Sequence, residues 1–307
     1  MVLSVCPNPS IDTYAWLEDF QLGKANRISK QEEFPGGKGV HVAMALQEAG
    51  APTVLMAAWA GHPGEWIKAA CKERGMATVG VDLKGMNRKC YTFLAEATAI
   101  RNTELMEPGP EMNGEDFDRF VGVFKDNLRQ SALTVMSGSW PKGAPKTAYR
   151  ELIAAANGSG KKVILDCSGE QLTHALEEKI FGIHLNEHEA KQYCGTSSVH
   201  EAFDKLHEKV ELIALTKGKE GLFLSYQGTR LHANVTLEKV ISTVGCGDCL
   251  TAGVALGVSR GYGVEEIARY GAAFGAANCL RPDLGMIYKA DVERLLPQVN
   301  INELTYG

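Results

Sequence analysis

Short apolar runs alternate along the chain with longer amphipathic stretches. The apolar runs have the length and composition of buried strands, and they are VLSVC (2–6), TVLMAAWAG (53–61), LTVMSGS (133–139), KVILDCSG (162–169), FGIHLN (181–186), ELIALTKG (211–218) and GLFLSY (221–226). The stretches between them have helical spacing, as at 63–75, 115–131, 145–158 and 199–209. Alternation of this kind predicts a mainly parallel sheet with helices on both faces. We therefore expect a three-layer α/β core.

Two segments break this alternation. Residues 12–34 and 88–107 carry polar, aromatic and charged residues in a loose two-residue alternation, which is typical of antiparallel strands with one buried face. We expect them to form a small β-sheet attached to a core of residues 1–11, 35–87 and 108–307. Because an exposed apolar face commonly closes over a ligand or meets another chain, we interpret this sheet as a lid. The alternative is a solvated pair of hairpins without a function.

Glycines introduce two of the predicted helices. STVGCGDCLTAG at 242–253 leads into an apolar helical run, and FPGGKGVHVAMALQEAG at 34–50 has the same layout. Free N–H groups at a helix start attract an anion. Asp248 stands beside them as an acceptor, which is what a hydroxyl needs when it loses its proton while attacking phosphorus. The alternative is an ordinary first-turn acid, but two such openings favour two anionic ligands and a phosphoryl-transfer site.

Composition narrows the class of protein. The chain has 307 residues and a formal net charge of −5, so it lacks the basic excess of nucleic-acid-binding domains. No apolar run reaches the roughly 18 residues that a membrane span requires. The first residues resemble a strand rather than a signal peptide, and the eight cysteines show no disulfide spacing. We expect a cytoplasmic protein with reduced thiols and with neither nucleic acid nor membrane as a partner.

Further motifs extend over nearly the whole chain. They are NPSID (8–12), LGKANR (22–27), GGKGVHVA (36–43), MEPGPE (106–111), SGSWPKG (137–143), VILDCSGE (163–170), LNEHE (185–189), LTKGKEG (215–221) and TVGCGD (243–248). In this order and separation the chain resembles the PfkB (ribokinase-like) family of carbohydrate kinases, most closely its 1-phosphofructokinase and tagatose-6-phosphate kinase branch. The glycine motifs are weak signals alone, so the resemblance depends on the whole set.

The resemblance implies a kinase that uses ATP and Mg²⁺ to phosphorylate a primary hydroxyl of fructose 1-phosphate, tagatose 6-phosphate or fructose 6-phosphate. It makes Asp248 the general base and the backbone of Gly245, Cys246 and Gly247 an anion hole. The residues implied at the sugar-phosphate site are Asp12, Gly37, Lys38, His41, Arg88, Ser137 and either Lys24 or Arg27. Those implied at the nucleotide site are Asn186, Glu189, Thr216, Lys217, Gly218, Gly221 and Asn278, with Glu189 organising Mg²⁺ through water. The family also suggests a homodimer that is joined through the lid.

Three positions depart from the family pattern. Ser242 stands where an aspartate is usual, which weakens the expectation of a monovalent-cation site. His41 replaces an asparagine in the sugar-binding helix, and His184 replaces a lysine before the N-x-x-E element. A neutral imidazole offers one donor and one acceptor, and it becomes a cation at lower pH. We therefore expect altered hydroxyl selectivity at His41 and a weaker or pH-dependent nucleotide contact at His184.

Two short motifs permit other chemistry. Residues 184–188 spell H-x-x-E-H, as in zinc peptidases, but the strand predicted up to His184 would keep the two imidazoles off a common helix face. Cys246 and Cys249 spell C-x-x-C, as in thioredoxin-type proteins, and we expect no more than an oxidation-sensitive Cys246 whose thiol pKa is lowered by the helix start.

Two further alternatives stay within the fold. One is a kinase of an unphosphorylated sugar. The other is a non-catalytic sugar or nucleotide sensor, which Asp248 disfavours because binding alone needs no base.

Overall fold

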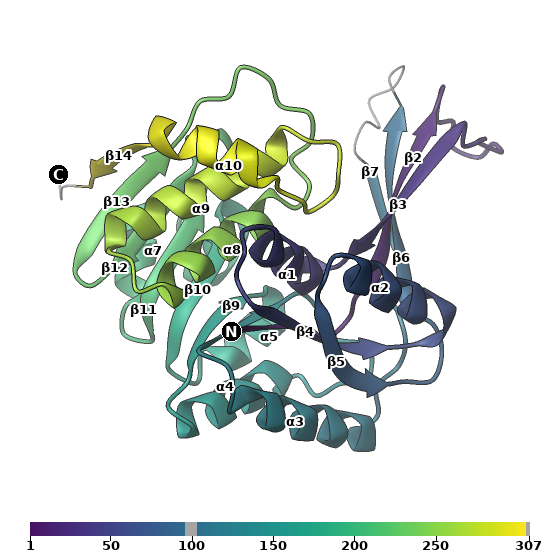
Figure 1. Ribbon diagram of the computed structural model, residues 1–307, viewed down its shortest axis with the longest axis horizontal. Coiled ribbons are helices and arrows are strands. Elements are labelled where there is room, and N and C mark those ends of the chain that lie inside the picture. The colour runs from purple at the N-terminus through teal and green to yellow at the C-terminus, as the bar shows by residue number, and fades with distance from the viewer. Residues whose placement is uncertain (96–102, 305–307) are drawn as a thin grey trace.

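The computed structural model describes residues 1–95 and 103–304 and contains two sheets (Figure 1). In spatial order the ten strands of the large sheet are β14 (Asn300–Glu303), β13 (Thr229–Asn234), β12 (Leu222–Tyr226), β11 (Val210–Thr216), β10 (Ile180–Asn186), β9 (Lys162–Asp166), β8 (Leu133–Ser137), β1 (Val2–Cys6), β4 (Thr53–Trp59) and β5 (Ala77–Asp82). The strands from β5 across to β11 are parallel, and β12, β13 and β14 are antiparallel to their neighbours. The predicted mainly parallel α/β fold is confirmed.

Helices cover both faces of this sheet. One face carries α1 (Lys38–Glu48), α2 (Gly61–Glu73), α8 (Cys246–Ser259), α9 (Val264–Cys279) and α10 (Lys289–Leu295). The other carries α3 (Gly114–Leu128), α4 (Ala148–Gly158), α5 (Gly169–Ala175), α6 (Glu187–Cys194) and α7 (Val199–Leu206). Strand β4 shows why three layers form, because Leu55 and Ala57 pack with α1 and α2, whereas Met56 and Ala58 belong to the core on the opposite face.

The small sheet stands beside the large one (Figure 1). Its strands in spatial order are β3 (Lys30–Gly36), β2 (Ser10–Leu17), β6 (Arg88–Ala95) and β7 (Thr103–Met106). Strands β2 and β6 are parallel, and the outer pairs are antiparallel. Residues 96–102, which the sequence analysis assigns to this sheet, lie outside the described residues. Leu22 and Leu105 leave 85% and 56% of their surface exposed, so this sheet and its connections present apolar side chains to solvent.

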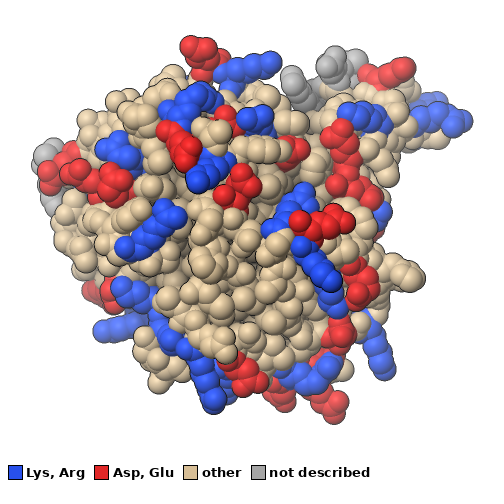
Figure 2. Space-filling view, viewed as in Figure 1, with Lys and Arg blue, Asp and Glu red and all other residues tan. Residues whose placement is uncertain are grey.

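The surface agrees with the balanced composition of the chain. On the face shown in Figure 2, basic and acidic side chains are interspersed rather than gathered by sign. A basic patch, which is the footprint of nucleic-acid binding, is not seen on this face. Within residues 1–95 and 103–304, no helix has the length and hydropathy of a membrane span.

Close packing of α8 against α9 determines where the start of α8 lies. A Cβ atom added to Gly253 would lie 2.4 Å from the Tyr270 carbonyl oxygen, and one on Gly257 would lie 3.0 Å from a side-chain carbon of Ile267. The two helices therefore approach backbone to backbone, which only glycine permits at these positions. Near its start, α8 also contacts the sheet, because Thr251 donates a hydrogen bond to Asp166 at the carboxyl end of β9. The packing on α9 and this hydrogen bond together hold the start of α8 at this edge of the sheet.

We expect Gly253→Ala to lower the stability of the fold by about 1–3 kcal/mol, because the added methyl group would force α8 and α9 apart. The measurement is thermal unfolding followed by circular dichroism. Gly122→Ala is the matched control, since Gly122 is exposed within α3 and has no atom within 4 Å of an added Cβ. Alanine there should preserve or raise the melting temperature by helix propensity. Equal melting temperatures for the two variants would contradict the close packing.

Candidate active site

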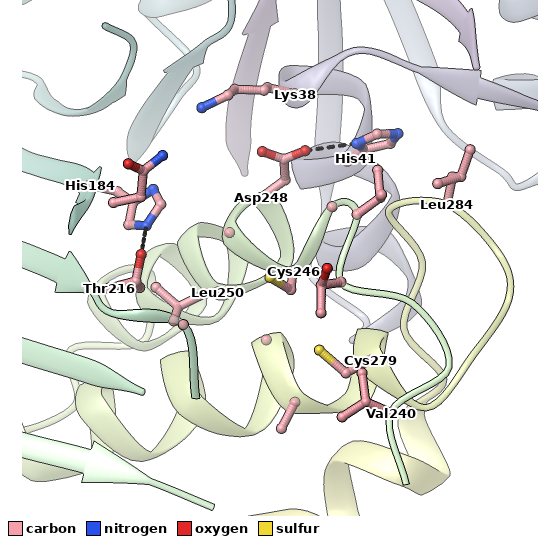
Figure 3. Close-up of a pocket in the computed structure, with 18 of the residues that line it drawn as sticks. Lys38, His41, His184, Thr216, Val240, Cys246, Asp248, Leu250, Cys279 and Leu284 are labelled. Carbon is pink, nitrogen blue, oxygen red and sulfur yellow. Dashed lines mark hydrogen bonds and ion pairs between the residues drawn. The ribbon is translucent and has the colours of Figure 1, made fainter. Parts of the chain in front are cut away.

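A cavity of about 1000 Å³ lies between the small sheet and the carboxyl ends of the parallel strands. Ligands of open α/β sheets bind at this edge. The sequence-predicted residues that line it are Asp12, Gly37, Lys38, His41, Arg88, Asn186, Thr216, Gly218, Gly221, Gly245, Cys246, Gly247 and Asp248. The fold therefore brings most of the predicted site together, although its members come from distant segments. Figure 3 shows part of this cavity, with Asp248 at the start of α8 between Lys38 and His41.

The other predicted site residues do not line this cavity; they are Arg27, Ser137, Glu189, Lys217 and Asn278. Arg27 is exposed in the connection between β2 and β3. Lys217 lies 3.6–3.7 Å from the carboxylates of Glu187 and Glu220.

Asn278 and Ser137 are both buried and do not line the cavity. Asn278 lies on the inner face of α9 with no exposed surface, and its Nδ2 donates a hydrogen bond to the Met286 carbonyl at 2.9 Å. It therefore supports the chain after α9. Ser137 is fully buried at the end of β8, and its Oγ has no hydrogen-bond partner within the described ranges. The ligand contacts that the resemblance implies for these two residues stay predictions.

The first turn of α8 depends on two glycines. Gly245 precedes the helix with φ of +82°, a left-handed conformation that favours glycine. A Cβ atom at Gly245 would also lie 2.6 Å from the Cα atom of Gly285, so the helix start and the 285 turn meet at van der Waals distance. A Cβ atom at Gly247 would lie 3.1 Å from the imidazole of His184. A larger residue at 245 would displace either the start of α8 or the turn at Gly285.

The backbone amides at the start of α8, where an anion hole is expected, differ in whether they already have an acceptor. The Cys246 amide donates a long hydrogen bond, 3.3 Å, to the carbonyl oxygen of Thr243. This amide is therefore partly committed. The amides of Gly247 and Asp248 belong to the first turn, where helix geometry provides no acceptor. These two amides are the better donors for an anion at the start of α8.

A chain of polar contacts links Asp248 to the small sheet. His41 lies with Nδ1 2.7 Å from Asp248 Oδ2 and with Nε2 3.2 Å from Asp12 Oδ2 (Figure 3). The Ser10 hydroxyl donates a hydrogen bond of 2.6 Å to Asp12 Oδ1. His41, Asp248 and Ser10 are all buried. The imidazole thus lies between two carboxylates that come from different elements, β2 and α8.

The surroundings of His41 favour its charged form. Burial disfavours an imidazolium, but the hydrogen bonds and charges of Asp12 and Asp248 outweigh it and raise the pKa of His41 to about 10. Burial likewise opposes the charge of Asp12, yet His41, Ser10 and Arg88 together hold the pKa of Asp12 below its usual value. These surroundings favour the protonated, positively charged form of His41. The sequence analysis expected the cation only at lower pH, because it could not place two carboxylates around the ring.

A second polar cluster lies on the opposite side of Asp248 and centres on Asp166, at the carboxyl end of β9. Lys38 Nζ lies 2.6 Å from Asp166 Oδ1 and 3.7 Å from Glu189 Oε1. Burial opposes the charge of Asp166, but Lys38 and His184 lower its pKa to well below the usual range. Burial also opposes the charge of Lys38, and Asp166, Asp248 and Glu189 keep its pKa above its ordinary value. Sequence reasoning did not select Asp166, although an acid that directly follows an apolar strand was a signal for it.

His184 belongs to this second cluster. Its Nδ1 lies 3.0 Å from Asp166 Oδ2, and its Nε2 lies 3.1 Å from Thr216 Oγ1. Burial lowers its pKa, but the Asp166 carboxylate reverses this and raises it. Because His184 lies on β10 whereas His188 lies on α6, the H-x-x-E-H spacing does not place two imidazoles on one helix face. The zinc-peptidase alternative is therefore unsupported.

Asn186 and Glu189 form a capping box at the start of α6. The Asn186 side chain accepts from the Glu189 amide at 3.0 Å, and the Glu189 side chain accepts from the Asn186 amide at 2.9 Å. This leaves Glu189 Oε1 directed toward Lys38. Mg²⁺ prefers oxygen donors and retains several waters. In the described part of the chain, no group of three His, Cys, Asp or Glu side chains is placed to hold a metal ion by itself.

Ser242 and the cysteines also have specific contacts. The Ser242 hydroxyl lies 2.7 Å from the Tyr14 hydroxyl and accepts from the Val244 amide at 3.2 Å. This serine therefore links the small sheet to the loop before α8. Cys249 is fully buried, and burial raises the pKa of its thiol well above the usual value.

Cys246 and Cys249 are both free thiols, as the sequence analysis expected. The thiol that interacts with Cys246 is that of Cys279 on α9, and this hydrogen bond lowers the pKa of Cys246. The sequence predicted the direction of this change from the helix start alone. The spacing could not reveal Cys279, which lies in a different helix.

Alternate residues of the small sheet form the remaining wall of the cavity. They are Arg88, Cys90 and Thr92 of β6 and Glu104 and Met106 of β7, and Tyr91 of β6 lines the cavity as well. The Arg88 Nε donates to the Asn8 carbonyl at 3.3 Å, and burial raises the pKa of Glu104. Sequence reasoning selected Arg88 from this wall but missed the others, although the two-residue alternation of strands was a signal for them.

Comparisons with known proteins agree with this geometry. The family model described as pfkB family carbohydrate kinase matches residues 8–288. The 1-phosphofructokinase of Bacillus subtilis (strain 168) is 32% identical over 310 residues, which cover 99% of this chain and 100% of that protein.

Two solved structures share the fold. Phosphofructokinase-2 of Escherichia coli, in complex with potassium, superposes with a TM-score of 0.87 at 22% identity over 96% of this chain and 98% of the other. A Thermotoga maritima protein described as a possible 1-phosphofructokinase has a TM-score of 0.88 at 23% identity, over 99% of this chain and 100% of the other. The chain therefore belongs to the pfkB family of carbohydrate kinases, phosphotransferases that act on a hydroxyl group.

Proposed function

We propose that this protein transfers the γ-phosphoryl group of ATP to a primary hydroxyl of a ketohexose phosphate. Family membership supports the sugar kinase, and the similarity to a 1-phosphofructokinase supports the class of acceptor. The observation that carries the proposal is the position of Asp248. Its carboxylate is buried in the first turn of α8, beside donor amides, and it lines the cavity that also holds Asp12 and Arg88.

In this reaction Asp248 accepts the proton of the acceptor hydroxyl while the alcohol oxygen forms a bond to the γ-phosphorus. The bond between that phosphorus and the bridging oxygen breaks, and its electron pair leaves with ADP. The amides of Gly247 and Asp248 and the ammonium group of Lys38 stabilise the charge on the phosphoryl oxygens. When bound, Mg²⁺ neutralises charge on the nucleotide phosphates, and Glu189 would hold its waters.

The nucleotide end of the cavity is proposed from its walls. Thr216, Gly218 and Gly221 lie where β11 ends and the chain turns into β12. Apolar side chains complete this end, and they are Val235, Leu237, Val240, Leu250, Ala272 and Ala276. A flat heteroaromatic base can pack against such a wall, with phosphates directed to the start of α8.

The acceptor end is proposed from the small sheet. Arg88 and Asp12 lie on paired strands and both line the cavity. Arg88 would bind the phosphate that the sugar already carries, and Asp12 would accept hydrogen bonds from sugar hydroxyls. We propose that this sheet acts as a lid and that its exposed apolar side chains, such as Leu105, contact a second copy in a homodimer. Light scattering with size-exclusion chromatography measures that state.

The substrate is tested by ADP release in the presence of ATP and Mg²⁺ over a panel of free and phosphorylated ketohexoses. Fructose 1-phosphate, tagatose 6-phosphate and fructose 6-phosphate are the expected acceptors. Preference for an unphosphorylated sugar would reassign the acceptor within the family. Tight sugar-phosphate binding without ADP release would instead identify a sensor and refute the kinase.

We expect Asp248→Asn to lower kcat by about 10²–10⁴-fold, since the amide cannot accept the hydroxyl proton. The KM for the sugar should change far less. Steady-state ADP release measures both constants. Asp126→Asn, which changes an exposed acid on α3, is the matched control and should leave them unaltered. Retention of more than half of the wild-type kcat in Asp248→Asn would contradict the assignment of the base.

We expect Arg88→Ala to raise the KM for a phosphorylated acceptor by about 10–100-fold, because a charge-assisted contact to phosphate is lost. The KM for ATP should stay close to the wild-type value. Lys89→Ala is the control, since the neighbouring ammonium group pairs with Glu33 at 2.7 Å and does not line the cavity. An equal effect of both variants on sugar-phosphate KM would show that Arg88 has no specific role.

A further inference from the structure

We propose that His41 is a positioning residue for the catalytic base, held as an imidazolium between Asp12 and Asp248 so that one oxygen of Asp248 is fixed and the other faces the acceptor hydroxyl. This role rests on the proposed function, because it takes Asp248 to be the base. It differs from the altered sugar selectivity that the sequence suggested for His41. The imidazole here acts on the reacting groups through Asp248.

The contacts of the ring give Asp248 a defined orientation. Nδ1 of His41 lies 2.7 Å from Oδ2 of Asp248, the distance of a strong charge-assisted hydrogen bond. Nε2 lies 3.2 Å from Oδ2 of Asp12. Each ring nitrogen therefore faces a carboxylate oxygen, an arrangement that suits an imidazolium with a proton on each nitrogen. Oδ2 of Asp248 is then occupied, which leaves Oδ1 to accept the proton of the substrate.

Glycine backbone lies directly against the side chains of His41 and Asp12. A Cβ atom at Gly285, where φ is +63°, would lie 2.0 Å from Cγ of His41. A Cβ atom at Gly36 would lie 2.1 Å from Cγ of Asp12. The imidazole is only 3% exposed. Glycine at 36 and 285 therefore leaves the space that these two side chains occupy, and a larger residue at either position would displace them.

The charges around His41 come from four elements. Asp12 of β2 and Asp248 of α8 contact the ring directly. Arg88 of β6 acts on Asp12, and Lys38 of α1 acts on Asp248. The turn at Gly285 presents backbone to the ring. Two neighbouring carboxylates repel one another, and an imidazolium between them offsets that repulsion.

This arrangement determines where protons go. The hydroxyl proton passes to Oδ1 of Asp248 as the new phosphorus–oxygen bond forms, and it leaves to solvent after the product departs. His41 keeps both of its protons throughout. Because His41 fixes the orientation of Asp248, a neutral side chain at position 41 should lower kcat far more than it changes the KM for the sugar phosphate.

The protonation of the ring is tested first, without reference to activity. Histidine labelled with ¹⁵N is observed by NMR in the ligand-free protein, with His41→Asn identifying the signals. We expect both nitrogens to be protonated at pH 7.5 and to lose a proton only near pH 10, since the pKa is raised from 6.5 to about 10. A neutral ring at pH 7.5 would overturn the proposal whatever the enzyme turns over.

Unfolding gives a second measurement on the same variants. The pKa of His41 is higher in the folded state than its ordinary value of 6.5, so its contribution to stability is complete below about pH 6.5 and is lost as the pH rises through about 10. The melting temperature of the wild type should therefore exceed that of His41→Asn by less at pH 10 than at pH 6.5. A difference that grows over this range has the wrong sign for an imidazolium.

Kinetics then separate positioning from a structural role. We expect His41→Asn to lower kcat by at least about 10-fold while the KM for the sugar phosphate changes far less, with His41→Gln behaving alike. His62→Asn, which changes an exposed histidine on α2, should match the wild type. A His41→Asn enzyme that keeps the wild-type kcat, or in which only KM changes, overturns the proposal for His41 alone. Absence of turnover in the wild type with every sugar overturns both this role and the proposed function.

Discussion

The contact between His41 and Asp248 joins two helices that each begin at a glycine and pack on the same face of the sheet. Helix α1 supplies the imidazole and Lys38, and α8 supplies the carboxylate. Removing these charges from water is costly unless each finds a partner. His41 and Lys38 of α1 lie beside the carboxylate at the start of α8, and their charges offset the cost of burying it. Two kinds of contact therefore fix the position of α8: close packing on α9 and charge pairing at its first turn.

The same pairing of buried charges is found in the cluster around Asp166. Asp166 has no exposed surface, and its oxygens are used by Lys38, His184 and Thr251. The ligand-free protein thus satisfies its buried charges internally. If Lys38 binds a nucleotide phosphate, as proposed, that phosphate must replace part of the Lys38–Asp166 pairing, so its affinity reflects the difference between two pairings.

The sequence predicted the elements whose pattern arises from burial. Strands such as β4 are buried on both faces and therefore form continuous apolar runs. Strands β13 and β14 were not predicted, because they are partly exposed and carry polar residues that form no such run. The helix starts and Asp248 followed from glycine chemistry and family resemblance. The partners of His41, Asp166 and Cys246 did not, since each contact joins segments far apart in the chain and its direction depends on packing.

The pairing of β2 with β6 has a mechanical consequence. Ser10 and Arg88 are direct partners in this parallel ladder, and Asp12 is two residues further along β2. A rotation of the small sheet as a rigid body would displace Asp12 and Arg88, which both line the cavity, at the same time. The same rotation would pull on the Asp12–His41–Asp248 contacts and on the Tyr14–Ser242 hydrogen bond before α8. Any such movement of the small sheet would therefore change the orientation of the carboxylate at the start of α8.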